Sequence, residues 1–147
     1  MTKDVLVTVK GKQIANDHED EIEVINVGTY HERNGKIYIR YEEQVEGTDA
    51  SVLNMIKIDG EGIEITKKGS VGAQMIFREN EKINSCYDTP YGMLMMAIYT
   101  NQIQCNIEQD KIEINVLYSI EMNGELLSDA DVYIKVESRG VNELNLV

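Results

Sequence analysis

The sequence is poor in several residue types, and each shortage excludes a class of protein. Its 147 residues include no tryptophan, one proline, one phenylalanine and two cysteines. Two cysteines cannot build a disulfide-rich scaffold, and without export signals we expect both Cys86 and Cys105 to be reduced. The single proline and the lack of low-complexity tracts argue against disorder. We therefore expect one folded domain over residues 1–147.

Long apolar segments are also missing. The stretch from Met1 to Lys10 mixes Asp4 and two lysines with short apolar residues, so it lacks the hydrophobic region of a secretory signal. The longest apolar run, Gly92 to Tyr99, is much shorter than the ~20 residues of a membrane-spanning helix. We therefore expect a soluble, cytoplasmic protein with no membrane partner.

Basic residues are scarce relative to acidic ones. The chain has 14 lysines and arginines against 26 aspartates and glutamates, which gives a formal net charge of −12. Most of such a surface repels a phosphate backbone, and no cluster of basic residues follows an amphipathic stretch that would hold anionic lipid. Nucleic acid is therefore excluded as an expected partner, and the acidity mainly favours solubility.

Motifs for catalysis or metal binding are absent. The chain has no Gly-x-x-x-x-Gly-Lys phosphate loop and no His-Glu-x-x-His zinc motif. His18 lies among Asp17, Glu19, Asp20 and Glu21, but neighbours on one loop do not converge as zinc ligands do, so we interpret this segment as a solvated acidic loop. The two histidines lie near loops and offer almost no general base for a nucleophile. A catalytic pair of carboxylates is an alternative that the sequence leaves open. We expect no metal, no cofactor and no catalytic residue.

What the sequence does contain is a regular alternation of apolar and polar residues, interrupted by turn residues. Val5, Val7 and Val9 share one face of the first alternating segment. About ten short segments of this kind follow one another, and no segment indicates a long helix. Serial hairpins favour an antiparallel up-and-down meander, and closing it into a β-barrel of eight to ten strands removes exposed edges.

Three turn signals set the expected strand registers. Asn34-Gly35 is the strongest, because both central residues of a type I′ turn need positive φ. Asp59-Gly60 predicts a similar two-residue loop, and Lys68-Gly69-Ser70 predicts a three-residue loop. The resulting opposed pairs are Tyr30 with Ile39, Gly28 with Tyr41, Ile56 with Ile63, Asn54 with Ile65, Ile65 with Ala73, and Ile63 with Met75.

The segment after Asp88-Thr89-Pro90 breaks the alternation. Met93 to Tyr99 is apolar on both faces, as expected of a strand that is covered on both sides or lies in a subunit interface. We expect the chain to turn near Asn101 and to return with Cys105 opposite Met96.

A second irregularity is expected before the last strand. A simple hairpin at Asn123-Gly124 would turn Asp129 and Asp131 inward. We therefore predict a bulge or a wider loop between Leu127 and Asp131, because one extra residue returns Val132 to the inner face.

Several of these segments resemble a known family. The stretch Tyr87-Asp88-Thr89-Pro90-Tyr91-Gly92, Phe77 at the end of the preceding strand and the two alternating strands that finish the chain are similar to the YwiB-like family of small bacterial proteins. The resemblance covers nearly the full chain and implies a calycin-type, lipocalin-like barrel. It implies no activity and no catalytic residue. The turn motif itself, Tyr87, Thr89, Pro90, Tyr91 and Gly92, is either a ligand-gating rim or a structural corner, and its turn chemistry favours the corner.

Polar residues whose place in the alternation puts them on the inner face of the barrel form the candidate binding site. They are Asn26, Tyr30, Tyr41, Asn54 and Tyr118. In an open lumen their side chains would orient a small, mostly apolar ligand by hydrogen bonds. In a filled core the tyrosines would pack by their rings and the asparagines would bond to the backbone, and this second interpretation is the one favoured for these residues.

Two functions follow from these alternatives. The first is an intracellular barrel that binds a small, neutral, hydrophobic or amphipathic molecule. We expect the ligand to be uncharged, because Arg40 is the only arginine well inside an expected strand and its side chain faces outward. No cation would then face the lumen to pair with an anionic ligand. The second is a noncatalytic structural or protein-interaction module, a homodimer with a filled core.

Overall fold

The computed structural model describes residues 1–139 apart from 16, 46, 70–71 and 90. These residues form ten β-strands and no helix, and so contain no helix that is long and apolar enough to cross a membrane. The strands are β1 (Asp4–Ala15), β2 (His18–Arg33), β3 (Lys36–Gln44), β4 (Ser51–Asp59), β5 (Gly62–Gly69), β6 (Gly72–Phe77), β7 (Lys82–Thr89), β8 (Gly92–Ile107), β9 (Lys111–Met122) and β10 (Glu125–Ser138).

The ten strands form one closed antiparallel barrel. Each strand pairs with its neighbours in sequence, and β1 pairs with β10 to close the sheet. The all-β, up-and-down barrel expected from the alternation is therefore confirmed.

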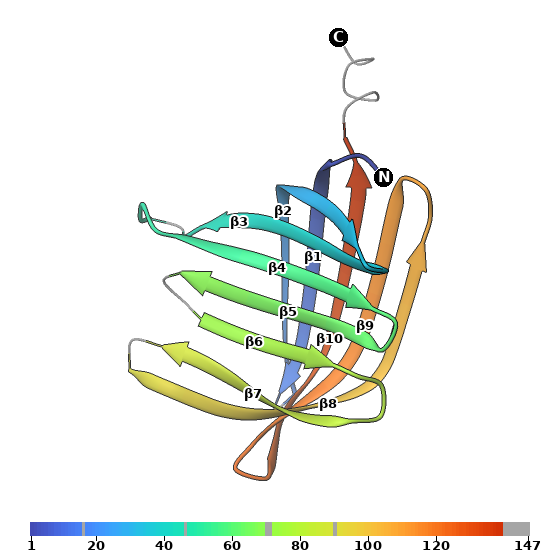
Figure 1. The fold of residues 1–147 in the computed structure, drawn as a ribbon. Helices are drawn as coiled ribbons and strands as arrows, with labels where there is room; N and C mark the ends of the chain where they lie inside the picture. Colours follow the sequence, from blue (N-terminus) through green and yellow to red (C-terminus); the bar gives the residue numbers. More distant parts are fainter. Residues whose placement is uncertain (16, 46, 70–71, 90, 140–147) are drawn as a thin grey trace.

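The barrel consists of two groups of strands that cross each other. Figure 1 shows β1, β9 and β10 running steeply, while β3 to β6 cross them. β2 and β8, each 16 residues long, belong to both groups. β2 pairs with β1 up to Thr29 and with β3 from Gly28, and β8 pairs with β7 up to Tyr99 and with β9 from Ala97.

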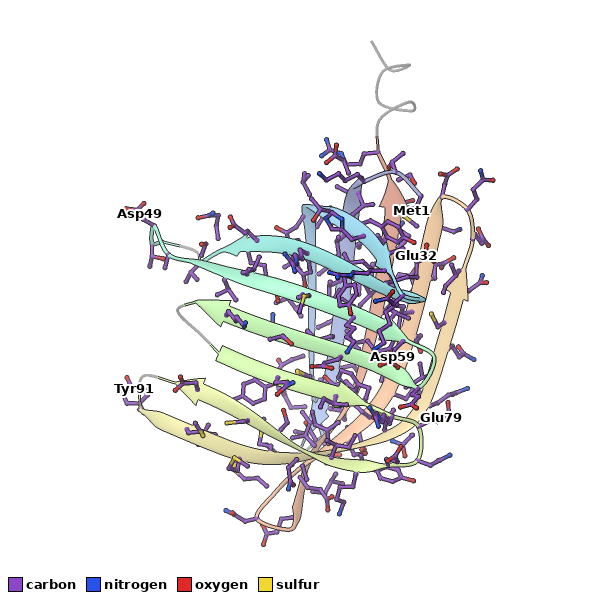
Figure 2. The ribbon with its side chains drawn as sticks, viewed as in Figure 1. Met1, Glu32, Asp49, Asp59, Glu79 and Tyr91 are labelled. Atoms are coloured by element: carbon purple, nitrogen blue, oxygen red, sulfur yellow. The ribbon has the colours of Figure 1, made fainter. Side chains whose placement is uncertain are left out.

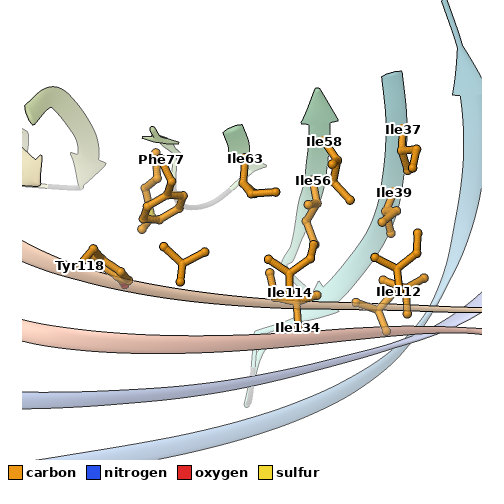
Figure 3. Close-up of a cluster of buried hydrophobic side chains, with 14 of the residues drawn as sticks. Ile37, Ile39, Ile56, Ile58, Ile63, Phe77, Ile112, Ile114, Tyr118 and Ile134 are labelled. Carbon is orange, nitrogen blue, oxygen red and sulfur yellow. The ribbon is translucent and has the colours of Figure 1, made fainter. Parts of the chain in front are cut away.

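Branched aliphatic side chains fill the space between the two groups. Figure 3 shows isoleucines from β3, β4 and β5 facing isoleucines from β9 and β10. Ile39, Ile56 and Ile114 have no exposed surface, and burying such a side chain contributes ~1.5–3 kcal/mol. The ring of Phe77 meets that of Tyr118 edge to face, with centroids 4.9 Å apart. The space between the two groups of strands is therefore a packed hydrophobic core.

The first hairpin register is confirmed. Asn34 and Gly35 have φ angles of 54° and 76°, and Gly28 lies opposite Tyr41 as the type I′ turn predicts. Gly28 is required there because its backbone approaches β3 closely. A Cβ built on Gly28 would lie 2.5 Å from the carbonyl oxygen of Arg40.

The next two registers were wrong by two residues. Ile56 lies opposite Ile65 rather than Ile63, because the β4–β5 loop consists of Gly60 and Glu61. Asp59 fixes this turn, since its Oδ1 accepts the backbone N–H groups of Glu61 (2.8 Å) and Gly62 (2.9 Å). Across β5 and β6, Ile65 faces Met75 and Ile63 faces Phe77, so Ala73 lies opposite Lys67 instead. Part of the predicted loop, residues 70–71, lies outside the described residues.

The predicted turn at Asn101 was also wrong. β8 continues through Asn101 with a register shift between Thr100 and Gln102, and Cys105 lies opposite Ile114 rather than Met96. An extra residue in an antiparallel pair bends the strand without ending it, and β8 uses this bend to pass from one group of strands to the other. Cys86 and Cys105 are free thiols.

The predicted irregularity before the last strand is present. The β9–β10 register shifts between Leu126 and Ser128, so the extra residue is Leu127, at the start of the predicted segment. Val132 then faces Val116 on the inner face, as expected.

The apolar run on β8 is not covered on both sides. The outward side chains of Met93 and Met95 are 64% and 58% exposed. Thr89 pairs with Gly92 across the preceding corner, whereas Pro90 lies outside the described residues.

The close approach at Gly28 gives a stability prediction. Gly28→Ala forces the β2 and β3 backbones apart, so we expect it to lower the free energy of unfolding by about 2 kcal/mol in urea denaturation. Gly60→Ala is the matched control, because a Cβ at Gly60 meets nothing within 4 Å. Equal unfolding midpoints for the two variants would contradict this account.

Candidate functional site

The inward polar residues do not converge on one pocket. The hydroxyl of Tyr30 donates to Oε2 of Glu32 (3.1 Å), near the first hairpin. Tyr41 lies opposite Asn54 across β3 and β4, while Tyr118 is on β9 in the other group of strands. Asn26 on β2 lies opposite the fully buried Val7.

Asn54 is the centre of a charged cluster on the inner face. It is completely buried, and its Nδ2 donates to Oε1 of Glu43 (2.8 Å). Nζ of Lys67 donates to Oδ1 of Asn54 (2.7 Å) and to Oε1 of Glu43 (3.2 Å). The expectation that no cation faces inward was therefore wrong, because Lys67 shares the inner face of Ile65 and lies opposite Asn54. Its charge is balanced by Glu43.

A recess of about 320 Å³ opens on the inner face of β1 and β2. Its apolar lining comes from Gly11, Ile22, Val132 and the ring of Tyr118. Four charged residues and one glutamine complete it: Lys12, Gln13, Asp20, Glu21 and Asp131. Gly11 leaves space at its floor, since a Cβ built there would meet only Cγ2 of Ile22, at 3.3 Å.

Tyr118 joins the recess to the packed core. Its side chain is 7% exposed, and burial raises the pKa of its hydroxyl to about 12, helped by the nearby Tyr87 and Asp131. This hydroxyl hydrogen-bonds no other residue in the described part of the chain. Thr100 lies opposite Tyr118, and its Oγ1 is a buried atom without a hydrogen-bond partner among the described residues. Two neighbouring hydroxyl groups therefore have unused hydrogen-bonding capacity.

The larger grooves lie on the outer face. One of about 670 Å³ is lined by polar side chains of the first hairpin, including His31, Tyr38 and Arg40. His31 is opposite Tyr38, as expected, and Arg40 is exposed. A groove of about 520 Å³ lies near Cys105 and Tyr133. The recess is smaller than both, but only a fold that closes the barrel creates it, and apolar groups from four strands, β1, β2, β9 and β10, line it.

The remaining candidates have structural positions. The hydroxyl of Tyr87 donates to Sδ of Met75 (3.1 Å), whereas the side chain of Tyr91, at the corner between β7 and β8 (Figure 2), is fully exposed. Nε2 of His18 lies 3.0 Å from Oδ1 of Asp20, and both side chains are exposed. No group of three potential metal ligands occurs among the described residues.

Sequence reasoning missed most of the residues that form the recess and the cluster. Sequence analysis gave Gly11, Ile22 and Lys67 no role in a site, and it placed Val132 on the inner face only as a strand position. One signal was available: Gly11 interrupts the inward series Val5, Val7, Val9, and a glycine within a strand marks a place where something approaches closely.

The pKa of Tyr118 predicts a specific loss of stability at high pH. The folded pKa exceeds the ordinary value of 10, so the unfolded chain releases this proton first, and the stabilisation that is present below pH ~10 is lost by pH ~12. We expect wild type to lose about 2 kcal/mol more than Tyr118→Phe over this range in urea denaturation. Equal losses in the two proteins would contradict the buried, neutral hydroxyl.

Comparisons with known proteins agree with this architecture. The chain is 22% identical over 127 residues to the uncharacterized β-barrel protein YwiB of Bacillus subtilis (strain 168), covering 85% of this chain and 88% of YwiB. The crystal structure of that protein superposes with a TM-score of 0.83 at 19% identity, covering 94% of this chain and 93% of the other. The model of a domain of unknown function, DUF1934, matches residues 7–134. Because this match spans most of the chain, the protein belongs to the DUF1934 family.

Proposed function

We propose that this protein binds a small, uncharged, mostly apolar molecule in the recess formed by Gly11, Ile22, Tyr118 and Val132. The observation that carries the proposal is the solvent exposure of the Ile22 side chain. This side chain points to the inner face, opposite Gly11, yet it is 64% exposed. An apolar wall left open beside a recess of about 320 Å³ has the size and lining of a site for a small ligand.

The hydroxyl of Tyr118 supports a ligand with one polar group. Tyr118 lines the recess, and the burial of its hydroxyl leaves it protonated over the physiological pH range. A neutral tyrosine hydroxyl can donate one hydrogen bond and accept others. A carbonyl, ether or hydroxyl group on the ligand would therefore find a partner there.

The charges around the recess favour a neutral ligand. Asp20, Glu21 and Asp131 lie at its rim, against one cation, Lys12, which forms an ion pair with Glu19 (3.1 Å). Lys67, the inward cation of the Asn54 cluster, is already bonded to Glu43. An anionic head group brought into the recess would lose water without gaining a free cation.

A ligand panel tests the proposal. We expect neutral fluorescent alcohols or esters to bind, and the matching fatty acids to bind weakly or not at all. Gly11→Leu fills the floor of the recess and should abolish binding, whereas Gly60→Leu makes the same substitution in the β4–β5 turn and should retain it. Tight binding of the acids, or unchanged binding by Gly11→Leu, would defeat the proposal.

Tyr118→Phe tests the polar contact separately. Removing one hydrogen bond should weaken the binding of a neutral ligand by about 1 kcal/mol, or roughly fivefold, in a fluorescence titration. Tyr41→Phe is the matched control, because Tyr41 is also buried but does not line the recess. Equal weakening by both variants would mean that the effect is not local to Tyr118.

A further inference from the structure

β8 leaves part of one edge open. It lies between β7 and β9 from Ala97 to Tyr99, but from Gln102 to Ile107 it pairs with β9 alone among the described residues. Figure 1 shows this part of β8 as the outer strand of its group, beside β9. The side chains of Cys105 and Ile107 are exposed, and that of Ile107 is 55% exposed.

The open edge presents backbone hydrogen-bonding groups. In an antiparallel pair, the N–H and C=O groups of alternate residues point toward the partner strand and away from it. The N–H of Ile103 points away from β9, because it donates to Oε2 of Glu79 (3.1 Å). By alternation, those of Cys105 and Ile107 point away from β9 as well. Glu79 thus covers one position of the edge and leaves the next two open.

This strand carries no charge. None of the 16 residues from Gly92 to Ile107 is charged, although 27% of the whole chain is, which would give about four such residues. Charged side chains and proline are the usual means of preventing an exposed edge from pairing with another strand. β8 has neither.

An open edge elsewhere in the barrel, on β2, shows the contrast. β2 pairs with β1 alone from His18 to Val27, since its pairing with β3 begins at Gly28. That stretch carries four acidic residues, Glu19, Asp20, Glu21 and Glu23. The same molecule therefore protects one edge with charge and leaves the other without it.

We propose that the β8 edge, Gln104 to Ile107, pairs antiparallel with the same edge of a second copy of this chain. A twofold axis brings identical edges together in antiparallel order, so one surface supplies both sides of the contact. Two copies that each carry a charge of −12 repel each other over most of their surfaces, and an uncharged strand is where they approach with least repulsion. The contact joins the two barrels through one continuous sheet.

Solution mass as a function of concentration tests the proposal. We expect light scattering after size exclusion to show wild type as a dimer that dissociates on dilution, and added salt to strengthen it by screening the like charges. Gln104→Lys combined with Asn106→Lys should give a monomer. Thr29→Lys combined with Thr66→Lys is the control, since it makes the same change in charge on strands with two neighbours and should leave the dimer intact.

Amide exchange locates the contact without any variant. The N–H groups of Cys105 and Ile107 should exchange more slowly as the protein concentration rises, while that of Ile103, already bonded to Glu79, should not change. A monomer at every concentration would overturn the proposal. A dimer that survives the Gln104 and Asn106 substitutions, with no protection at Cys105 and Ile107, would also overturn it.

Discussion

The structure depends on contact between the inward side chains of the short crossing strands and those of the long strands. Isoleucines of β3 and β4 pack against isoleucines of β9 and β10, and Phe77 and Tyr118 meet at one side of this layer. Branched aliphatic side chains have few rotamers and fit a pleated surface closely. This packed layer fixes the angle at which the two groups of strands cross. The recess, the Asn54 cluster and the open edge of β8 all lie at its borders.

The Asn54 cluster shows how polar groups are accommodated at that boundary. Asn54 is fully buried, but both ends of its amide have charged partners, Glu43 and Lys67. Those two partners are each about 30% exposed, so their charges stay partly hydrated. Removing Lys67 would leave the buried Oδ1 of Asn54 without this partner, which costs ~1–3 kcal/mol, whereas without Glu43 the Nδ2 group keeps a long hydrogen bond to the carbonyl oxygen of Val52 (3.4 Å). The cluster therefore provides partners for its buried polar groups, whereas the hydroxyl groups of Tyr118 and Thr100 have no hydrogen-bond partner among the described residues.

The sequence predicted which side chains face inward better than which residues face each other. Ile56 and Ile65 were both assigned to the inner face, although the loop at Asp59 was placed wrongly, because a register error of two residues preserves the face of every side chain. The same error hid the contact between Lys67 and Asn54, although the spacing of Lys67 from Ile65 already placed Lys67 on the inner face. Asn101 was misread since polar residues that bulge and polar residues that turn look alike in a single sequence. The recess was not predictable, because Gly11, Tyr118 and Val132 meet only after the barrel closes.

That closure has a consequence for the synthesis of the chain. β1 pairs with β10 from Val5 to Ile14, and Thr2 near the N-terminus donates its backbone N–H to Oγ of Ser138, 136 residues later. Of the ten strands, β1 is synthesised before β10 and must therefore wait for it before its second edge is paired. Contacts between such distant segments form slowly, because the intervening loop must be closed first. Until then Val5 and Val7 lack half of their final surroundings, and the nascent chain needs its early hairpins, or a chaperone, to keep them from other partners.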